Sequence, residues 1–476
     1  MAKKNDTTLL VFALLITVTL LGGVLWWLRG QFSTGEPFSA ESQSMGKGTG
    51  NDPSSSLQPT AIGERISLGD RLLIIAEASQ SKQAGIEAFA KQDFKTAVAK
   101  FKESLQANRN DPETLIYLNN AQVKLEQKAP IKIAVSVPIG SNLNVSQEIL
   151  RGVAQAQDEL NRRGEPRLEV AIANDDNDPG LARQVAARFV KDSSILAVVG
   201  HNSSDASIAA APIYQQGQLV MITSTSSADA ISGIGSYIFR VVPSSRLTTN
   251  MLSKYLFNTA RKTAIAVCLD SKSPDSQSFA DNMISTLGSD GGRFVNVGCD
   301  FAAPDFNAGT IVSKAVSSGA EVLLLAPQID RLDAAINVAR TNQGRLLMIG
   351  NQTMYTIKTL KQGQGEVNGL ILPVSWHPDA IASNPFSANA SQYWGGRVNW
   401  RTAMSYDAVQ TIVAGLKQNN RRDGLQKVLS SPQFFATGAT GKIQFLPSGD
   451  RNGSSIVVRV QPSSQPGDYE FAIASP

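Results

Sequence analysis

The sequence predicts an α/β protein with two lobes, each built on a doubly wound parallel sheet. Three observations lead to this class. From residue 131 onward, short apolar runs alternate with amphipathic segments, as in parallel sheets whose strands are joined by helices. The alternation stops near residue 242 and then begins again, which indicates a second sheet. Finally, 476 residues with 42% hydrophobic and 18% charged side chains are enough for several ordinary folded domains.

The first thirty residues predict a membrane anchor. No charge occurs from Thr7 through Leu28, and a helix of that length crosses a hydrocarbon core of about 30 Å. Lys3 and Lys4 precede this run, so we expect a single pass through the cytoplasmic membrane, with the N-terminus in the cytoplasm and the rest in the periplasm or outside the cell. A cleaved signal peptide is the alternative, but its apolar region is normally only about 7 to 15 residues long.

Two further segments precede the α/β part. Residues 31–62 are rich in Ser, Gly, Pro and Thr and predict a flexible linker. Residues 63–129 predict helices that resemble a tetratricopeptide repeat, with Gly85 at the small position of one helix and Phe94 and Phe101 on the next. One and a half repeats cannot bury both faces, so we expect this segment to pack on its neighbours or on a protein partner. A plain helical spacer is the alternative.

The two sheets are expected to follow one another along the chain after Pro130. The first has strands at 131–139, 168–174, 195–200, 219–223 and 237–242 and helices at 145–162, 179–191 and 204–215. The second has strands at 264–269, 294–299, 321–326 and 346–350 and helices at 247–259, 276–287, 308–317 and 332–341. Each lobe then presents turns at its strand ends, which implies a cleft between the lobes.

Two consecutive turns in the first sheet carry the main candidate site. Asn202, Ser203 and Ser204 follow one strand, and Ser226 and Ser227 follow the next. Open α/β sheets bind ligands at these carboxyl ends, and hydroxyls together with helix N-terminal N–H groups suit a carboxylate or another small anion. Serines are also common helix caps and turn formers, so the structural interpretation stays open.

Signatures of other functions are absent. There is no H-E-x-x-H, C-x-x-C, P-loop or G-x-S-x-G motif. His201 is close to Ser204 and Asp205 in sequence, whereas catalytic triads are assembled from separated segments. The acids from Asp175 to Asp178 lack calcium-loop spacing and fit helix capping. With a net charge of +4 and no basic stripe, nucleic acid is also excluded. We predict no enzyme activity, no cofactor and no metal.

The two cysteines, Cys268 and Cys299, end consecutive predicted strands of the second sheet. An exported compartment permits a disulfide between them. Two small buried apolar side chains explain them equally well, because free cysteine is often buried. The sequence leaves both alternatives open.

Residues 131–476 resemble the type I periplasmic solute-binding proteins, the family of leucine/isoleucine/valine-binding proteins and receptor ligand-binding regions. The motifs in order are IKIAVSVPIG, NDDNDPGLARQVAARFV, VVGHNSSD, MITSTSSAD, DFNAGTIVSKAVSSGAEVLLL, MSYDAVQTIVAGL and TGATGKIQFLPSGDR. The resemblance implies three crossings between the lobes, near 242–244, 372–375 and 445–449. Lobe 1 would comprise residues 130–243 and 375–445, and lobe 2 residues 244–374 and 446–476.

The resemblance also implies an amino-acid site in the cleft, held largely by lobe 1. Ser204 falls on a hydroxyl position of that site, and Ser226 and Ser227 fall on the carbonyl and hydroxyl positions of the next turn. Four residues depart from the family pattern: Val145 and Gln328 at aromatic positions, Asp275 at a tyrosine position, and Gln352 in place of the acid that pairs with the ammonium. A buried ammonium without a counter-charge costs several kcal/mol, so a neutral or anionic polar ligand, or no ligand, fits at least as well.

Two functions follow from these observations. The first is a membrane-anchored solute-binding protein that presents a small polar or anionic ligand, amino-acid-like or related, to an ABC transporter permease or a signalling membrane protein. The second is a cell-envelope scaffold that resembles the lipoproteins activating peptidoglycan synthases, in which this fold binds no small ligand. The chain lacks the lipid-anchor cysteine of those proteins. In both cases the helical segment offers a surface for a protein partner.

Overall fold

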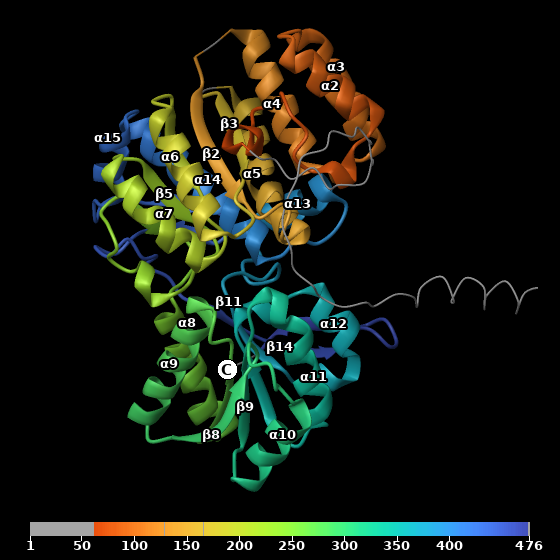
Figure 1. The fold of residues 1–476 in the computed structure, drawn as a ribbon, viewed down its shortest axis with the longest axis vertical. Coiled ribbons are helices and arrows are strands. Elements are labelled where there is room, and N and C mark those ends of the chain that lie inside the picture. The colour runs from red at the N-terminus through yellow and green to blue at the C-terminus, as the bar shows by residue number, and fades with distance from the viewer. Residues whose placement is uncertain (1–60, 128, 165, 475–476) are drawn as a thin grey trace, which may run out of the picture. The chain divides into compact units, whose positions relative to one another are not determined.

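The computed structural model describes residues 61–127, 129–164 and 166–474 (Figure 1). The predicted anchor at 1–30 lies outside the described residues, as does nearly all of the predicted linker. Among the residues that are described, none of the helices combines the length and the apolar composition needed to cross a membrane.

The first lobe contains a six-stranded sheet in the order β1-β3-β2-β4-β5-β6. Five strands are parallel, as expected: β2 (Ile131–Val137), β3 (Leu168–Asn174), β4 (Ile195–Val199), β5 (Val220–Thr223) and β6 (Ile238–Arg240). The expectation of an all-parallel sheet is wrong at one edge, where β1 (Ile66–Ser67) pairs antiparallel with β3. This short strand reaches the sheet from the N-terminal segment and needs no crossover helix, which only parallel neighbours require.

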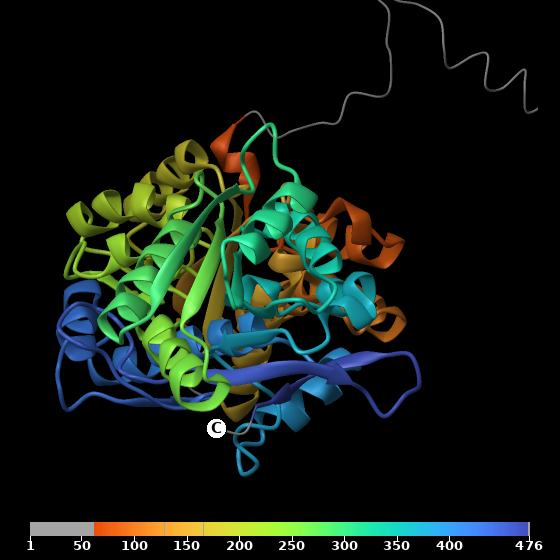
Figure 2. The same cartoon turned by 90° about the horizontal axis from the view of Figure 1, so that it is seen from below.

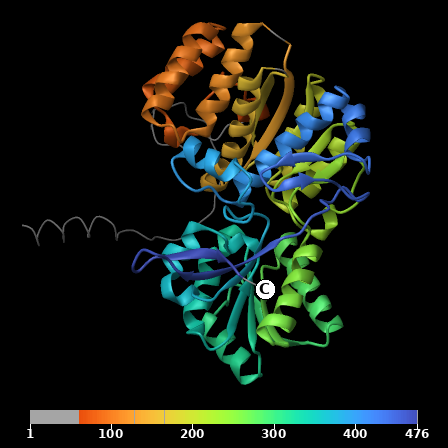
Figure 3. The ribbon, with the colours of Figure 1, turned by 180° about the vertical axis from the view of Figure 1, so that it is seen from behind.

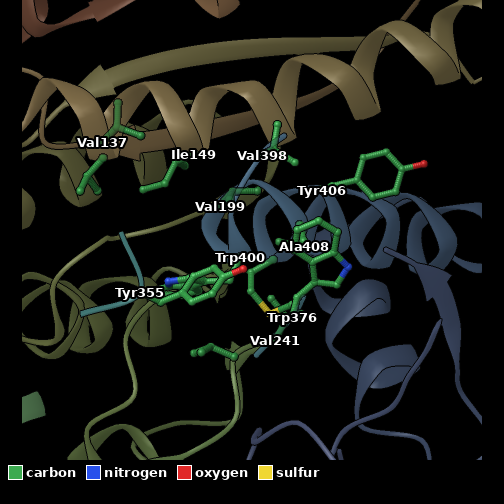
Figure 4. Packing of buried hydrophobic residues seen from close by; sticks show 14 of the residues in the cluster. Val137, Ile149, Val199, Val241, Tyr355, Trp376, Val398, Trp400, Tyr406 and Ala408 are labelled. Atoms are coloured by element: carbon green, nitrogen blue, oxygen red, sulfur yellow. The ribbon is translucent and has the colours of Figure 1, made fainter. Parts of the chain in front are cut away.

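Helices from two parts of the chain cover this sheet. They are α5 (Leu143–Arg163), α6 (Pro179–Lys191), α7 (Ser204–Gln216), α13 (Phe386–Trp394), α14 (Trp400–Gln418) and α15 (Arg422–Leu429). Helices α5 and α14 pack closely because Gly152 has no side chain: a Cβ there would lie 2.2 Å from the Thr402 carbonyl oxygen. Ile149 of α5 and Ala408 of α14 belong to the same apolar cluster (Figure 4).

The N-terminal helices are built onto this lobe. Helices α2 (Gln80–Ala90) and α3 (Phe94–Ala107) pack together, and α4 (Pro112–Glu126) packs against α3, α5 and β3. Asn120 of α4 bonds both backbone groups of Val170 in β3, at 2.7 Å and 3.0 Å. Lys82 is fully buried with its Nζ 2.8 Å from carboxylates of both Asp111 and Glu113. The segment therefore shares its packing with the sheet.

The second lobe contains a seven-stranded sheet in the order β15-β14-β11-β10-β9-β7-β8. Its strands are β7 (Ala264–Leu269), β8 (Arg293–Asp300), β9 (Val322–Ala326), β10 (Leu347–Gly350), β11 (Ile371–Val374), β14 (Ile456–Pro462) and β15 (Tyr469–Ile473). The first five are parallel. The last two form an antiparallel hairpin that pairs with β11 (Figures 2 and 3). The expected all-parallel sheet is wrong here too, because hairpin strands must run in opposite directions.

The helices of this lobe are α8 (Ser245–Tyr255), α9 (Pro274–Ser289), α10 (Ala308–Ser317), α11 (Leu332–Asn342) and α12 (Ile357–Gly363). Cys268 of β7 and Cys299 of β8 are partners in the strand register and form a disulfide. Of the two alternatives that the sequence left open, the structure has the disulfide. It closes a loop of chain that contains α9.

Candidate functional site

The two predicted turns meet at the carboxyl edge of the first sheet, because β4 and β5 are parallel neighbours. Ser203 caps α7 by accepting a hydrogen bond from the Ala206 N–H. The hydroxyl of Ser204 accepts a hydrogen bond from the Ala228 N–H at 3.2 Å, which ties the first turn to the second. The N–H groups of Ser204 and Ser227 are left to face the other lobe.

A carboxylate from the second lobe fills this position. Asp275, in the first turn of α9, accepts hydrogen bonds from the N–H and the hydroxyl of Ser227 at 2.8 Å and 2.9 Å. Its second oxygen accepts the N–H of Ser204 at 3.3 Å. Hydrogen bonds to charged groups contribute roughly 1.5–3 kcal/mol each, and the N-terminus of α7 favours a negative charge. The groups that the sequence offers to a ligand carboxylate thus hold a carboxylate of the protein.

The cavity that remains between the lobes is small. Its volume is about 50 Å³, room for roughly four water molecules and far less than an amino acid needs. Six of the eight predicted site residues line it: Asn202, Ser203, Ser227, Asp275, Gln328 and Gln352. Val145 lines it as well.

The other two predicted residues lie behind the cavity wall. Ser204 is fully buried between the two turns. Ser226 is also fully buried, and its hydroxyl bonds the hydroxyl of Ser207 at 2.8 Å. Of the lining amides, Gln352 accepts the Ser375 hydroxyl at 2.7 Å, and Gln328 accepts the N–H of the next residue. The two turns therefore use part of their hydroxyls to hold each other.

Sequence reasoning missed several residues that line the same cavity: Thr225, Thr248, Phe279, Ile329, Asn351, Thr353, Pro373, Trp400 and Arg401. Arg401 is 6% exposed and its guanidinium lies 4.5 Å from the ring of Trp400. Burial lowers its pKa to about 10, against the opposing effect of Glu148. A signal was available, because an arginine is the second residue of a helix whose following residues, TAMS and then AV and TIVAGL, are mostly apolar or small.

Acidic groups gather around the Asp275 carboxylate. Asp205 lies in the first turn of α7. Its pKa is raised by burial first, and then by the negative charges of Asp275 and Asp270. This end of the cleft therefore resists a further negative charge.

The histidine near these turns has a structural role. The His201 ring is fully buried, with Nδ1 2.5 Å from Asp175 and Nε2 3.0 Å from the hydroxyl of Tyr214. Ser204 bonds Ala228 instead of His201, so no activated serine is formed. Across the described parts of the chain, no group of three or more His, Cys, Asp or Glu side chains could hold a metal ion.

Two α/β lobes that meet over a polar cavity at their strand ends define a class of two-lobed, cleft-forming binding proteins. Comparison with known families gives the same class. The model of the family described as periplasmic binding protein matches residues 130–464, so the chain belongs to this family. The match begins after the N-terminal helices, and the tetratricopeptide resemblance of residues 63–129 stays a prediction.

Relatives of described function are distant. An amino acid binding protein of Pseudomonas aeruginosa is 25% identical over 338 residues, which is 69% of this chain and 90% of that protein. A leucine-binding protein of Thermotoga maritima has the same fold, with a TM-score of 0.63, 20% identity and coverage of 72% of this chain and 97% of that one. A Rhodopseudomonas palustris solute-binding protein in complex with 4-hydroxybenzoate has a TM-score of 0.65, 15% identity and coverage of 72% and 96%.

Proposed function

We propose that this chain is an extracytoplasmic solute-binding protein of the ABC-transporter type, anchored in the membrane by residues 1–30. It takes a small solute of the amino-acid or organic-acid kind into the cleft between its lobes. The closed form is then recognised by a membrane permease or a signalling protein. The chain crosses between the lobes near 242–244, 372–375 and 445–449, and the lobes close as rigid bodies about these segments, as in hinge-type binding proteins.

The hydrogen bonds around Asp275 are the observation that carries this proposal. In these bonds the paired turns hold the Asp275 carboxylate with two N–H groups and one hydroxyl, which supports a site for a carboxylate in this cleft. The same bonds join both lobes through this carboxylate. A ligand shifts the equilibrium only if it binds the closed form better, and a solute in the cavity that residues of both lobes line meets this condition.

The relatives support the choice of solute. The Pseudomonas protein is named for amino acids, and the Rhodopseudomonas protein was solved with an aromatic acid. Both ligand types carry a carboxylate. In this chain Gln352 replaces the acid that would pair with an ammonium, which favours an organic acid over an amino acid.

A thermal-shift screen of amino acids, amides and small organic acids tests the proposal on the full chain. A solute at about 100 times its Kd adds about 2.7 kcal/mol to the free energy of unfolding, and the melting temperature rises accordingly. A screen in which no solute raises the melting temperature would contradict the proposal.

A second candidate is a scaffold that binds protein instead of a solute. Two observations favour it: Asp275 already fills the carboxylate position, and a groove of about 820 Å³ runs along α3, α4 and the end of α5. The groove is apolar along Val98, Leu105, Leu115 and Leu118, and Leu125 at its side is 49% exposed.

Point substitutions separate the two candidates better than removal of residues 62–128, because that deletion would strip β1 and α4 from the first sheet. Leu125→Glu should abolish binding to a purified peptidoglycan synthase if the chain is a scaffold. It should leave solute binding unchanged if the chain is a transport receptor. Phe294→Glu, at a residue that is 42% exposed on the other lobe, is the matched control.

A further inference from the structure

A buried arginine, Arg401, lines the cleft at a helix N-terminus, where the helix dipole disfavours positive charge. Arg401 is the second residue of α14, and positive charge is unfavourable at a helix N-terminus. The residue as a whole is 6% exposed. Within the described residues it makes neither a side-chain hydrogen bond nor an ion pair, although buried charges are normally paired.

The acids near Arg401 are committed to other groups. Glu148 of α5 pairs with Arg151 at 2.9 Å and accepts the hydroxyl of Thr402 at 2.5 Å. Asp275 is held by the serine turns. Neither carboxylate comes within ion-pair distance of the Arg401 guanidinium. Glu148 acts on the Arg401 charge and raises its pKa, but it forms no ion pair with it among the described residues. The guanidinium can therefore still pair with an anion from outside.

Other polar atoms beside Arg401 also lack partners. The indole N–H of Trp400 and the amide oxygen of Asn351 are buried without a hydrogen bond among the described residues. Both residues line the small cavity together with Arg401. A buried polar group without a partner costs about 1–3 kcal/mol, so a solute that reached this donor and this acceptor would remove that cost.

Arg401 opens onto a second, larger cavity. This cavity has a volume of about 390 Å³, in the size range of small-molecule sites. It shares Val145, Ile329 and Arg401 with the small one and lies between α5 and α12. Its other cations are neutralised, Arg151 by Glu148 and Lys358 by Asp333 at 2.8 Å. The cavity therefore has a net positive charge, which comes from Arg401.

We propose that Arg401 is the anion-binding residue of this cleft and that the solute is a small organic anion whose carboxylate pairs with its guanidinium. Asp275 stays bound to the serine turns, so the solute lies in the cavity between α5 and α12. Its carboxylate then points away from the serine turns, whereas an amino acid held by those turns would point its carboxylate toward them. Trp400 contributes its ring face and N–H, and Asn351 its carbonyl. The inference rests on the proposed function and specifies its solute class.

The test compares acids with their amides in three forms of the full chain. Benzoate, glutarate and glutamate are titrated beside benzamide, glutaramide and glutamine, with melting temperature and calorimetry as readouts. The forms are the wild type, Arg401→Met and the control Lys358→Met, which removes a paired cation from the same cavity. We expect the wild type to bind an acid at least tenfold more tightly than its amide. The affinity for that acid should fall at least tenfold in Arg401→Met and less than threefold in Lys358→Met.

The melting temperature without solute tests the alternative that Arg401 only stabilises the fold. Arg401→Met keeps the apolar stem and removes a buried charge that has no ion-pair partner among the described residues, so its melting temperature should equal or exceed that of the wild type. A lower melting temperature, or equal binding of acids to both proteins, would overturn the assignment. If only amides bind, and equally to both, the assignment fails while the proposed function stands. If no solute of the wider screen binds, both fail.

Discussion

The two ends of the interlobe cleft treat charge in opposite ways. At the serine end, defined by Ser204, Ser227 and Asp275, the protein supplies both the anion-binding groups and the anion. At the arginine end, defined by Asn351, Trp400 and Arg401, two buried polar atoms have no hydrogen-bond partner among the described residues, and Arg401, which is 6% exposed, has no ion-pair partner among them. The serine end is therefore complete without a solute, and the arginine end is not. If the proposed solute binds at the arginine end, a shared fold does not determine which end of the cleft recognises it.

The largest effect is expected from the disulfide, because it closes the loop that carries Asp275. Cys268 and Cys299 are 31 residues apart, and a loop of this length predicts about 4 kcal/mol of stabilisation. The double variant C268S/C299S should lose that much in urea unfolding. Hydrogen exchange should rise in β7, α9 and β8 while α14 stays protected. Equal unfolding midpoints for the variant and the oxidised wild type would contradict this, and wild type under reductant serves as the control.

The next effect concerns the closed state of the lobes. Asp275→Ala removes three hydrogen bonds that join them, worth together about 3 kcal/mol, which is less than the sum of three separate bonds because all three share one carboxylate and are not additive. The closed-to-open ratio should fall by more than about 100-fold, and the radius of gyration from small-angle scattering should rise. The same variant should bind added carboxylates at the serine end.

Asp281→Ala on the exposed side of the same helix is the control. If both variants keep the wild-type radius of gyration, the Asp275 contacts do not hold the lobes together.

A smaller effect is expected from the Ser227 hydroxyl. Ser227→Ala removes one of the three bonds to Asp275 and keeps the backbone N–H, so it should cost about 1 kcal/mol of closure. In the Asp275→Ala background the same substitution should have no effect on closure, because its partner is gone. A full effect in that background would show that the hydroxyl acts through another group.

The smallest effect is a pH dependence at the serine end. Burial and the charges of Asp275 and Asp270 raise the pKa of Asp205 above its ordinary 3.8. The folded protein thus binds this proton more tightly than the unfolded chain, so the stabilisation is present below pH 3.8 and is lost as pH rises through the raised pKa. Asp205→Asn should stabilise the protein at pH 7, by less than about 1 kcal/mol because the group is partly exposed.

The gain from Asp205→Asn should disappear near pH 3.5, when melting temperatures are measured across the range in both proteins. A gain that is the same at every pH would point to packing instead of charge.

Local patterns predicted most of the elements. The expected strand at 168–174 and the helices at 179–191 and 308–317 coincide with β3, α6 and α10. The edge strand β1 was not expected, because two residues carry too little periodicity. The C-terminal hairpin changes the second sheet from parallel to mixed through its pairing with β11, a contact between segments more than eighty residues apart.

The same division holds for the site. By itself, the sequence determined that two serine turns would stand side by side at one sheet edge, because adjacent parallel strands bring their ends together. Only the tertiary structure decided that Asp275 from the other lobe binds those turns and that Arg401 is buried with no ion-pair partner in the part of the chain that the structure describes. Both facts depend on how distant segments pack, since a charge is neutralised or left unpaired by its neighbours in space and not by its neighbours in the chain.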